Sequence, residues 1–285
     1  MIIIADGGST KTDWRFIDKN QKISQAQSRG FNPFYQKNAE IIEILRTELL
    51  SQIPDNQTVG KLYYYGTGCS TDENQQIVKQ AISEVLKLEK KNIFIEHDLL
   101  GAARALCGKE QGIACILGTG SNSCVYDGEK ITQNLPNLGY ILGDEGSGGH
   151  LGKQLLQDFF NEIMPERLRQ FFQKRFNINR DQVVENLYKK PFSNRYLASF
   201  SKFAFDHLSD FYCANLVYQS LDLFFQRNIC RYPTHKEIPV HFTGSVAFYF
   251  SNILRQVASD RGICVKNILE SPIAGLTLYH LSNGK

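Results

Sequence analysis

The chain has 285 residues, of which 42% are hydrophobic and 21% are charged, and its formal net charge at neutral pH is +3. A chain of this length buries roughly three quarters of the surface that it exposes when unfolded, which is enough for about two domains. Because the net charge is small and no run of Lys and Arg stands out, nucleic acid and anionic membranes are excluded as main partners.

Seven cysteines are dispersed along the chain, without a C-x-x-C pair or the spacing of metal ligands. Such a set is typical of reduced cysteines that serve as small apolar side chains. The sequence begins directly with an apolar strand, and no apolar run reaches the ~20 residues of a membrane helix. We therefore expect a soluble, cytoplasmic protein without a signal peptide.

Strands and helices are predicted to alternate along the first hundred or so residues. The predicted strands cover residues 2–5, 12–18, 23–27, 61–66 and 92–98, and the predicted helices cover residues 37–53, 70–88 and 99–108. The helix over 70–88 begins with a capping-box pattern from Ser70 to Glu73. The alternation indicates an α/β sheet with helical crossovers.

The opening pattern then occurs a second time. The segment "ACILGTGSNSCVYDGEKI" has the same order as "IIIADGGSTKTDWRFIDKNQKI": an apolar strand, a turn of glycine and hydroxyl residues, a strand, a polar turn and a strand. In the second copy, Asp127-Gly128 predicts a type I′ hairpin turn. Two copies about a hundred residues apart favour a duplicated domain over a solenoid. A coincidence of two glycine hairpins is the alternative.

The remainder of the chain is helical and rich in aromatic residues from 164 to 232, and then alternates again. Strands are predicted over residues 238–244 and 263–270, and helices over residues 246–262 and from Pro272 onward. We interpret the aromatic stripe of the helical part as core or subunit contact rather than as a cofactor site.

The two glycine turns, "DGGSTK" and "GTGS", are candidate phosphate-binding elements. Neither is a Walker A loop or a dinucleotide fingerprint, because each leads into a strand and not into a helix. Backbone amides together with Ser9, Thr10 and Ser121 could face one phosphate chain. Asp6 would then face Mg²⁺, which prefers a carboxylate with waters and phosphate oxygens. The alternative for each turn taken singly is an ordinary Gly-Ser turn.

Six motifs resemble, in this order, the BadF/BadG/BcrA/BcrD-type ATPase family, and within it the N-acetylglucosamine kinases: "ADGGSTKTDW", "GTGCSTDE", "ILGTGSNS", "LGYILGDEGSGGHLG", "FTGSVA" and "SPIAGL". The resemblance implies an actin-like (ribonuclease H-like) ATPase fold. In that fold, two duplicated α/β domains, each with a mixed five-stranded sheet, close on ATP in the cleft between them. The first lobe would comprise residues 1–108 completed by the helix 272–285, and the second residues 109–271, with a helical insertion around 164–232.

The resemblance also assigns roles to individual residues. It implies nucleotide binding by Gly7, Gly8, Ser9, Thr10, Lys11, Gly118, Thr119, Gly120, Ser121, Gly244 and Ser245, and Mg²⁺ binding by Asp6. It implies sugar binding by Asn32, Thr119, Gly139, Tyr140 and Asp144. The segment "NLGY" departs from the glycine- and tryptophan-rich run of the animal enzymes, so the identity of the sugar stays open.

Asp98, at the end of the strand "NIFIEHD", is the candidate catalytic base, at the position where similar kinases deprotonate the attacking hydroxyl. The alternative is that Asp98 is a helix N-cap, in which case its carboxylate stays ionised and is a weak proton acceptor. Asp144 is the next candidate for the base. Asp144 and Glu145 could instead be first-turn acids of a following helix.

The resemblance implies an ATP- and Mg²⁺-dependent sugar kinase that converts N-acetylglucosamine to its 6-phosphate and forms a homodimer. Glucosamine, N-acetylmuramic acid and glucose stay open as acceptors. One alternative is an ATPase that activates a dehydratase through an iron-sulfur cluster. The only close cysteines are Cys107, Cys115 and Cys124, which are predicted in a helix end and two strands. A second alternative is a non-catalytic protein that senses sugar or nucleotide, for which the sequence offers no DNA-binding helix-turn-helix.

Overall fold

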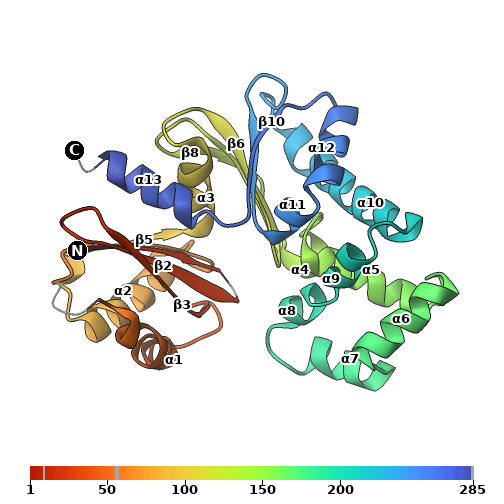
Figure 1. The fold of residues 1–285 in the computed structure, drawn as a ribbon, viewed down its shortest axis with the longest axis horizontal. Helices are drawn as coiled ribbons and strands as arrows, with labels where there is room; N and C mark the ends of the chain where they lie inside the picture. The colour runs from red at the N-terminus through yellow and green to blue at the C-terminus, as the bar shows by residue number, and fades with distance from the viewer. Residues whose placement is uncertain (9, 55–57, 284–285) are drawn as a thin grey trace. The chain divides into compact units, whose positions relative to one another are not determined.

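The computed structural model describes residues 1–8, 10–54 and 58–283. The chain divides into two compact units, each with its own five-stranded sheet. Unit 1 comprises Met1–Glu110, Gly128–Lys130 and Ser271–Lys285, and unit 2 comprises Gln111–Asp127 and Ile131–Glu270. In Figure 1, unit 1 runs from red through orange to the gold of α3 (Asp98–Cys107) and includes the dark blue C-terminal helix. The two mixed sheets with their helices confirm the predicted α/β class.

The sheet of unit 1 has the strand order β3-β2-β1-β4-β5. Its strands are β1 (Ile2–Gly7), β2 (Lys11–Ile17), β3 (Ile23–Arg29), β4 (Lys61–Gly66) and β5 (Ile93–His97). β1, β2 and β3 are antiparallel neighbours, whereas β1, β4 and β5 run parallel. The carboxyl ends of β1, β4 and β5 therefore lie at one edge of the sheet, where ligands of open α/β sheets bind.

Both faces of β1 are buried, which explains its continuous apolar sequence. Ile3 and Ala5 belong to the core beneath α1 (Asn38–Ile44) and α2 (Asp72–Leu86). Ile4, between them, packs on the opposite face with Ile273 and Leu276 of α13 (Ile273–Asn283). That face is also covered by α3 (Asp98–Cys107), which packs against α13.

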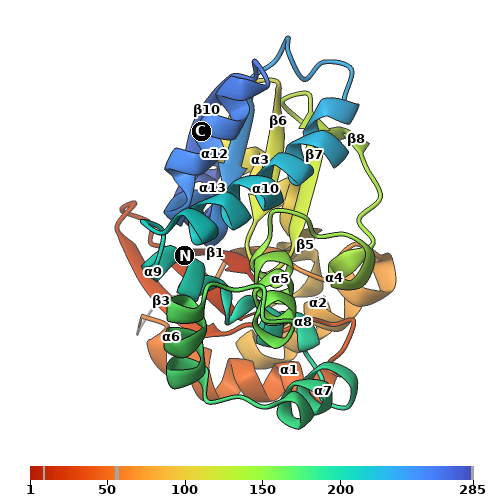
Figure 2. The same cartoon turned by 90° about the vertical axis from the view of Figure 1, so that its right-hand side faces the viewer.

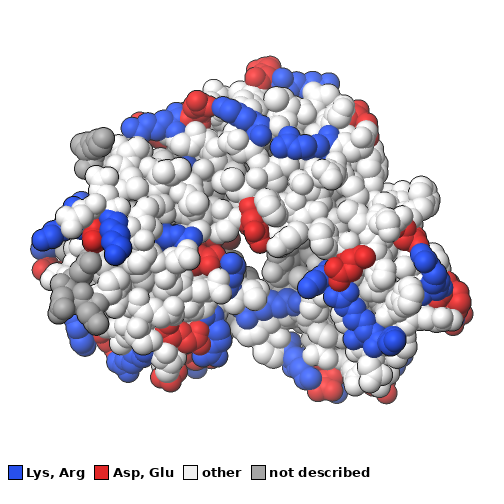
Figure 3. Space-filling model, viewed as in Figure 1, with Lys and Arg blue, Asp and Glu red and all other residues white. Residues whose placement is uncertain are grey.

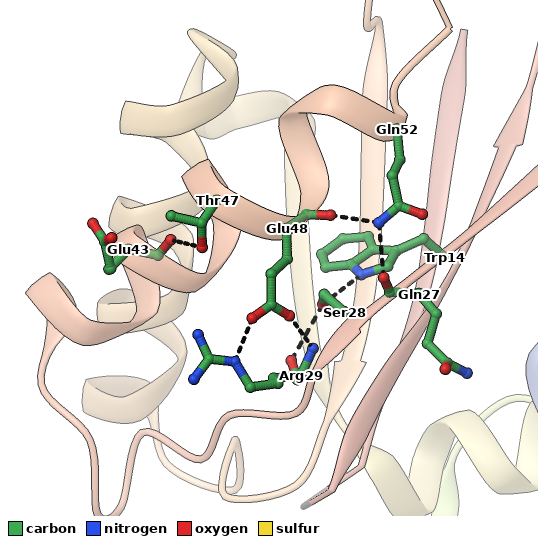
Figure 4. A network of polar contacts seen from close by, with 8 residues as sticks. All are labelled: Trp14, Gln27, Ser28, Arg29, Glu43, Thr47, Glu48 and Gln52. Atoms are coloured by element: carbon green, nitrogen blue, oxygen red, sulfur yellow. Dashed lines mark hydrogen bonds and ion pairs between the residues drawn. The ribbon is translucent and has the colours of Figure 1, made fainter.

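The predicted helix over 37–53 is in fact three short pieces, because hydrogen bonds to β3 shape its second half. α1 is followed by a π-helical turn, η1 (Leu45–Leu49), and a 3₁₀ turn, η2 (Leu50–Gln52). Figure 4 shows the side chains of Glu48 and Gln52 reaching the β3 backbone, with N···O distances of 2.6 Å from the Arg29 amide to Glu48 and 2.8 Å from Gln52 to the Gln27 carbonyl. Beneath them, the buried indole of Trp14 donates to Ser28.

The predicted capping box of α2 is wrong by one residue. Thr71, in an extended conformation, is the N-cap, and its hydroxyl accepts a hydrogen bond from the Asn74 amide at 3.3 Å. Ser70 and Glu73 therefore do not form the reciprocal pair that the pattern predicted. Since Ser, Thr and Asp all favour the N-cap, a run of such residues leaves the choice among them open in sequence.

The sheet of unit 2 repeats the topology of unit 1, with the order β10-β9-β6-β7-β8. Its strands are β6 (Gly112–Leu117), β7 (Ser121–Tyr126), β8 (Ile131–Asn134), β9 (Val240–Thr243) and β10 (Val265–Leu269). As in unit 1, the first three strands in chain order are antiparallel neighbours, the fourth (β9) pairs in parallel with the first (β6), and the fifth (β10) pairs in parallel with the fourth. The duplicated architecture predicted from the glycine-turn repeat is thereby confirmed.

The predicted type I′ turn at Asp127-Gly128 is wrong. Tyr126 pairs with Ile131, so four residues connect β7 and β8, and the pairing register shifts between Val125 and Tyr126. Gly128 has a φ of +104°, and an added Cβ would lie 2.4 Å from the Lys109 carbonyl oxygen. The glycine is therefore required by a close backbone approach rather than by a two-residue hairpin.

Ten helices belong to the described part of unit 2, where they form most of the core. They are α4 (Gly139–Leu142), α5 (Gly148–Phe160), α6 (Glu166–Phe176), α7 (Arg180–Tyr188), α8 (Ser193–Ala198), α9 (Ser201–Asp206), α10 (Phe211–Arg227), η4 (Ile229–Arg231), α11 (Ser245–Tyr249) and α12 (Ser251–Asp260). The aromatic stripe is buried: Phe172 and Phe203 meet edge to face at 5.0 Å. α10 crosses the sheet in Figure 2, and its Phe225 packs on Phe242 of β9.

Charged side chains of both signs are interspersed on the face shown in Figure 3. This distribution is consistent with the small net charge of the sequence. Among the described residues, no helix combines the length and the apolar character needed to cross a membrane.

Candidate active site

The carboxyl edge of the unit 1 sheet brings together three chain segments that the sequence analysis singled out. Gly7 of β1 pairs with Gly66 of β4, which in turn pairs with His97 of β5. The residues that follow these strands therefore leave the sheet side by side, and the Thr67 amide donates to the Gly7 carbonyl at 2.9 Å. The first glycine turn, the segment 66–70 and Asp98 all begin at this edge.

The first glycine turn connects β1 to β2 and is closed by a hydrogen bond of 2.9 Å from the Gly8 amide to the Lys11 carbonyl. An added Cβ at Gly7 would lie 2.1 Å from the Tyr64 hydroxyl oxygen, so no side chain fits there. Lys11 pairs with Asp13 at 3.0 Å, and the Thr10 carbonyl accepts a hydrogen bond from Gly30. Ser9, predicted to bind nucleotide, lies outside the described residues.

Asp6 lies one residue before the end of β1, directly opposite Asp13 of β2. Burial raises the pKa of Asp6 to about 7, and the neighbouring carboxylates of Asp13 and Asp98 add to this effect. The Ser271 hydroxyl donates to Asp6 at 3.3 Å, and Lys11 lies nearby, but neither offsets the increase. A bound cation would relieve this repulsion, so the position suits a divalent metal ion.

Asp98 is the first residue of α3 and not its N-cap. The N-cap is His97, whose Nδ1 accepts a hydrogen bond from the Leu100 amide at 3.3 Å. The Asp98 carboxylate accepts one from the Leu99 amide at 2.9 Å. Burial raises the pKa of Asp98, although His97 and the Leu99 amide act in the opposite direction. The N-cap alternative is therefore wrong, and the raised pKa makes Asp98 a stronger proton acceptor than a capping carboxylate would be.

Asn32 reaches the same edge by packing on the segment that follows β4. Gly68 has a φ of +78°, and an added Cβ there would lie 2.0 Å from Asn32 Oδ1. One residue further, burial raises the pKa of the Cys69 thiol to about 12, with a further contribution from the nearby Asp98 carboxylate. Gly68 and Cys69 therefore connect the surroundings of Asn32 with those of Asp98.

The second glycine turn, in unit 2, is anchored by the first turn of α5. The Gly118 and Thr119 carbonyls accept hydrogen bonds from the amides of Gly148 and Gly149, at 2.8 Å and 3.0 Å. The Ser121 amide donates to Asp144 at 3.1 Å. Within the described part of the chain, the amides of Thr119 and Gly120 have no hydrogen-bond acceptor. These two amides are the donors that the turn can offer to an anionic ligand.

Asp144 is buried against the second glycine turn. Its backbone is left-handed, with a φ of +57°, and an added Cβ at Gly120 would lie 2.9 Å from Asp144 Oδ2. Burial raises the pKa of Asp144 against the opposing effects of the Ser121 amide and the Asn137 side chain. α5 begins only at Gly148, so the prediction of Asp144 and Glu145 as first-turn acids is wrong.

Asn137 is a site residue that the sequence analysis did not identify. Its side chain donates to Asp144 at 3.1 Å and also to the Ser121 carbonyl, and its Oδ1 accepts from the Gly139 amide at 2.7 Å. Gly139 has a φ of +70° and begins α4, whereas Tyr140 packs partly against the core. A cavity of about 460 Å³ adjoins Asn137 and Asp144. The only indication in the sequence was the departure of "NLGY" from the family pattern.

Gly244 brings the start of α11 against the second glycine turn. It has a φ of +113°, and an added Cβ would lie 2.3 Å from the Leu117 carbonyl oxygen and 3.2 Å from the Gly118 nitrogen. Ser245, the first residue of α11, is therefore held beside Gly118 at the carboxyl edge of the sheet of unit 2. Because glycine has no side chain, the two backbones can approach each other closely, and a ligand can approach both without meeting a side chain.

No protein-family model matches the sequence. A solved structure of a candidate N-acetylglucosamine kinase from Porphyromonas gingivalis is 42% identical to the chain, covers all of both chains and superposes with a TM-score of 0.94. A second candidate N-acetylglucosamine kinase, from Chromobacterium violaceum, is 17% identical over 98% of each chain, with a TM-score of 0.73. At that identity, the likeness concerns the fold alone.

A ROK-family glucokinase from Streptomyces griseus, solved with glucose and AMPPNP, also shares the fold, with 14% identity, 100% and 99% coverage and a TM-score of 0.56. Among curated proteins, the N-acetyl-D-glucosamine kinase of Dictyostelium discoideum is 26% identical over 165 residues. That match covers 53% of this chain and 51% of the relative, so the chain matches about half the length of this curated protein.

Proposed function

Since the chain belongs to the N-acetylglucosamine kinase group of the BadF/BadG/BcrA/BcrD-type ATPases and is a sugar kinase, we propose that it phosphorylates N-acetylglucosamine on its 6-hydroxyl with ATP. The observation that carries the proposal is the carboxyl edge of the unit 1 sheet. There, a carboxylate with a raised pKa, Asp98, shares its surroundings with Asp6 and with the segment on which Asn32 packs.

In the proposed reaction, Asp98 accepts the proton of the sugar hydroxyl while the hydroxyl oxygen forms a bond to the γ-phosphorus of ATP. The bond between this phosphorus and the bridging oxygen breaks, and ADP leaves with the bonding electrons. Asn32 donates a hydrogen bond to a sugar oxygen and thereby orients the hydroxyl. Asp98 later releases its proton to solvent, so the base returns to its starting state.

Asp6 is the proposed Mg²⁺ ligand of unit 1, and Mg²⁺ would neutralise charge on the phosphates. In the described residues, no group of three or more His, Cys, Asp and Glu side chains is arranged to hold a metal ion alone. This agrees with a cation that reaches the protein with the nucleotide and takes one carboxylate from it. The exposed residues Thr10 and Lys11, with Gly7 and Gly8, complete the proposed phosphate contacts of unit 1.

Unit 2 is proposed to contribute one set of residues that bind the nucleotide and another set that bind the sugar. The Thr119 and Gly120 amides would donate to phosphate oxygens, and Gly244 and Ser245 would contact the adenosine. Asp144 would accept hydrogen bonds from sugar hydroxyls through the lone pairs that Ser121 and Asn137 leave open. Gly139 and Tyr140 belong to the same proposed sugar-binding segment.

The rival activity with an iron-sulfur cluster receives no support from the cysteines. Cys107, Cys115 and Cys124 are all buried in the cores of their units, whereas a cluster shared by two subunits needs accessible thiolates. The homodimer and the cytoplasmic location stay predictions.

The deciding experiment is a screen for ADP release with ATP, Mg²⁺ and each of four sugars: N-acetylglucosamine, glucosamine, N-acetylmuramic acid and glucose. We expect kcat/KM to be highest for N-acetylglucosamine, and product analysis to place the phosphate on the 6-hydroxyl. A higher kcat/KM for another sugar would reassign the acceptor. If no sugar raises ADP release, the proposal of a kinase is wrong and the sensing alternative gains support.

A further inference from the structure

Two adjacent aromatic side chains of unit 1 are exposed to solvent at the turn that carries Asn32. Phe34 is 71% exposed and Tyr35 is 61% exposed. Their rings meet edge to face, with centroids 5.0 Å apart and an interplanar angle of 79°. In contrast, the preceding Phe31 is fully buried and stacks on Tyr64. The chain therefore turns at residues 32–33 and presents the next two aromatic rings outward.

Hydrogen bonds hold this turn in place. The Phe34 amide donates to Asn32 Oδ1 at 2.9 Å, and the amides of Tyr35 and Gln36 both donate to the Asn32 carbonyl at 3.0 Å. In return, the Gln36 side-chain oxygen accepts a hydrogen bond from the Asn32 amide at 2.9 Å. Because the backbone is fixed in this way, the exposure of the two rings is a property of the fold and not of a loosely held loop.

The same hydrogen bonds set the chemistry that Asn32 can offer. Its Oδ1 is occupied by the Phe34 amide, so its Nδ2 group remains to donate to a ligand oxygen. The turn packs on Gly68, which belongs to the segment beside Asp98. A ligand oriented by Asn32 toward Asp98 therefore comes next to the aromatic pair.

We propose that Phe34 and Tyr35 form a stacking platform for the C–H face of the acceptor pyranose, an inference that rests on the proposed sugar kinase function. Aromatic rings bind sugars through the axial C–H bonds of one ring face, while the hydroxyls at the ring edge take hydrogen bonds. In the β-anomer of the gluco configuration all ring substituents are equatorial, and the axial hydrogens of C2 and C4 lie on the same face. An axial hydroxyl at C2 or C4 interrupts this face and leaves the opposite one open. A platform that stacks on the face of the C2 and C4 hydrogens therefore selects gluco-configured acceptors over their manno and galacto epimers.

The test compares Phe34→Ala, Tyr35→Ala and the conservative Phe34→Tyr with a matched control, Phe211→Ala, which removes an 83% exposed aromatic ring from unit 2. We expect each alanine variant of the platform to raise the sugar KM by about 10-fold, with kcat and the ATP KM within about twofold of wild type. Phe34→Tyr and Phe211→Ala should leave the sugar KM near that of wild type. Discrimination against the C2 and C4 epimers should weaken only in the platform alanine variants.

Calorimetric Kd values for the sugar separate this proposal from the proposed function, because they require no turnover. If the wild type binds sugar but releases no ADP, the kinase proposal fails, while the platform still predicts weaker binding in the alanine variants. An unchanged sugar Kd in both platform variants overturns the platform. A change of oligomeric state on sedimentation, without a change in sugar Kd, would instead identify the pair as a protein contact.

Discussion

Asp98 combines two properties that the proposed catalytic base needs: a position at the carboxyl edge of the unit 1 sheet and a raised pKa. Its hydrogen bond from the Leu99 amide keeps the carboxylate oriented, while burial makes its protonated form easier to reach. His97 performs the capping of α3. Capping and chemistry are thus carried by neighbouring residues, so they can be separated by mutation.

We predict that Asp98→Asn lowers kcat by about 10²–10⁴-fold, because the amide cannot accept the hydroxyl proton. Asparagine is nearly isosteric and still accepts from the Leu99 amide, so the melting temperature and the Kd values for sugar and ATP should stay close to those of wild type. Single-turnover kinetics with calorimetry and thermal unfolding provide the three readouts. A near-native kcat would remove Asp98 as the base and make Asp144 the next candidate.

Asp6 should make the protein less stable as the pH rises from 3.8 to about 7. Its pKa is about 7 in the folded chain, compared with 3.8 for an unperturbed aspartate carboxyl. Between these values the unfolded chain has lost the proton that the folded chain retains, so the free energy of unfolding falls as pH increases. We predict that Asp6→Asn abolishes this contribution. Raising the pH from 5 to 8 should therefore lower the free energy of unfolding of wild type by on the order of 2 kcal/mol more than that of Asp6→Asn.

Urea unfolding of wild type and Asp6→Asn at both pH values measures this difference directly. Asp13→Asn is the informative companion variant, because it retains Asp6 but removes one of the carboxylates that raise its pKa. Its pH dependence should therefore lie between those of the other two proteins. A stability difference between wild type and Asp6→Asn that is the same at pH 5 and pH 8 would contradict the assignment.

At the scale of elements, the glycine turns differ in how they are held. Each turn is closed by a backbone hydrogen bond of its own, from Gly8 to Lys11 in the first and from Gly118 to Gly120 in the second. Only the second is also held by the N-terminal amides of α5 and by Asp144. Gly118 and Gly120 therefore respond differently to a side chain. Gly118 has no heavy atom within 4 Å of an added Cβ, but at Gly120 the Cβ meets Asp144.

We predict that Gly118→Val weakens ATP binding at least 10-fold while the melting temperature changes by little, since only a ligand would occupy the space that the new side chain fills. Gly120→Val should lose both nucleotide affinity and stability, because it also displaces Asp144. Calorimetry with ATP and thermal unfolding of the two variants distinguish the effects. Unchanged ATP affinity in Gly118→Val would show that the phosphates do not approach this turn.

Local sequence patterns predicted the strands and the glycine turns. They did not predict features that depend on contacts between segments far apart in the chain. The apolar run of β1 and the repeated glycine turns predicted two similar sheets, as found. The splitting of helix 37–53 depends on Glu48 and Gln52 reaching β3, which no pattern within the helix reveals. Likewise, Asn137 joins Asp144 to the second glycine turn through side-chain contacts alone, so its role was not visible from spacing.

At the scale of the whole molecule, the same motif of a strand, a glycine turn and a strand occurs in both units, with different surroundings. Each sheet begins with a strand, a glycine turn and an antiparallel strand. In unit 1 the surroundings of that turn are acidic, and the carboxylates of Asp13 and Asp98 lie close enough to Asp6 to raise its pKa. In unit 2 the turn offers the amides of Thr119 and Gly120, which have no acceptor among the described residues. Under the proposed function, both units offer phosphate contacts, whereas the proposed base and the proposed cation ligand both lie in unit 1.

The proposed kinase function predicts that ATP stays intact on the protein until a sugar is present. A kinase must favour a sugar hydroxyl over water, which it achieves when the acceptor completes the site and excludes solvent. We predict that ADP release without sugar is at least about 100-fold slower than with N-acetylglucosamine. The 6-deoxy analogue of N-acetylglucosamine lacks the acceptor hydroxyl but keeps the other groups that bind. It should raise hydrolysis above the sugar-free rate, because water then takes the place of the 6-hydroxyl. Initial rates under the three conditions test this, and Asp98→Asn serves as the control in which sugar no longer stimulates turnover. Equal rates with and without sugar would mean that the acceptor does not complete the site.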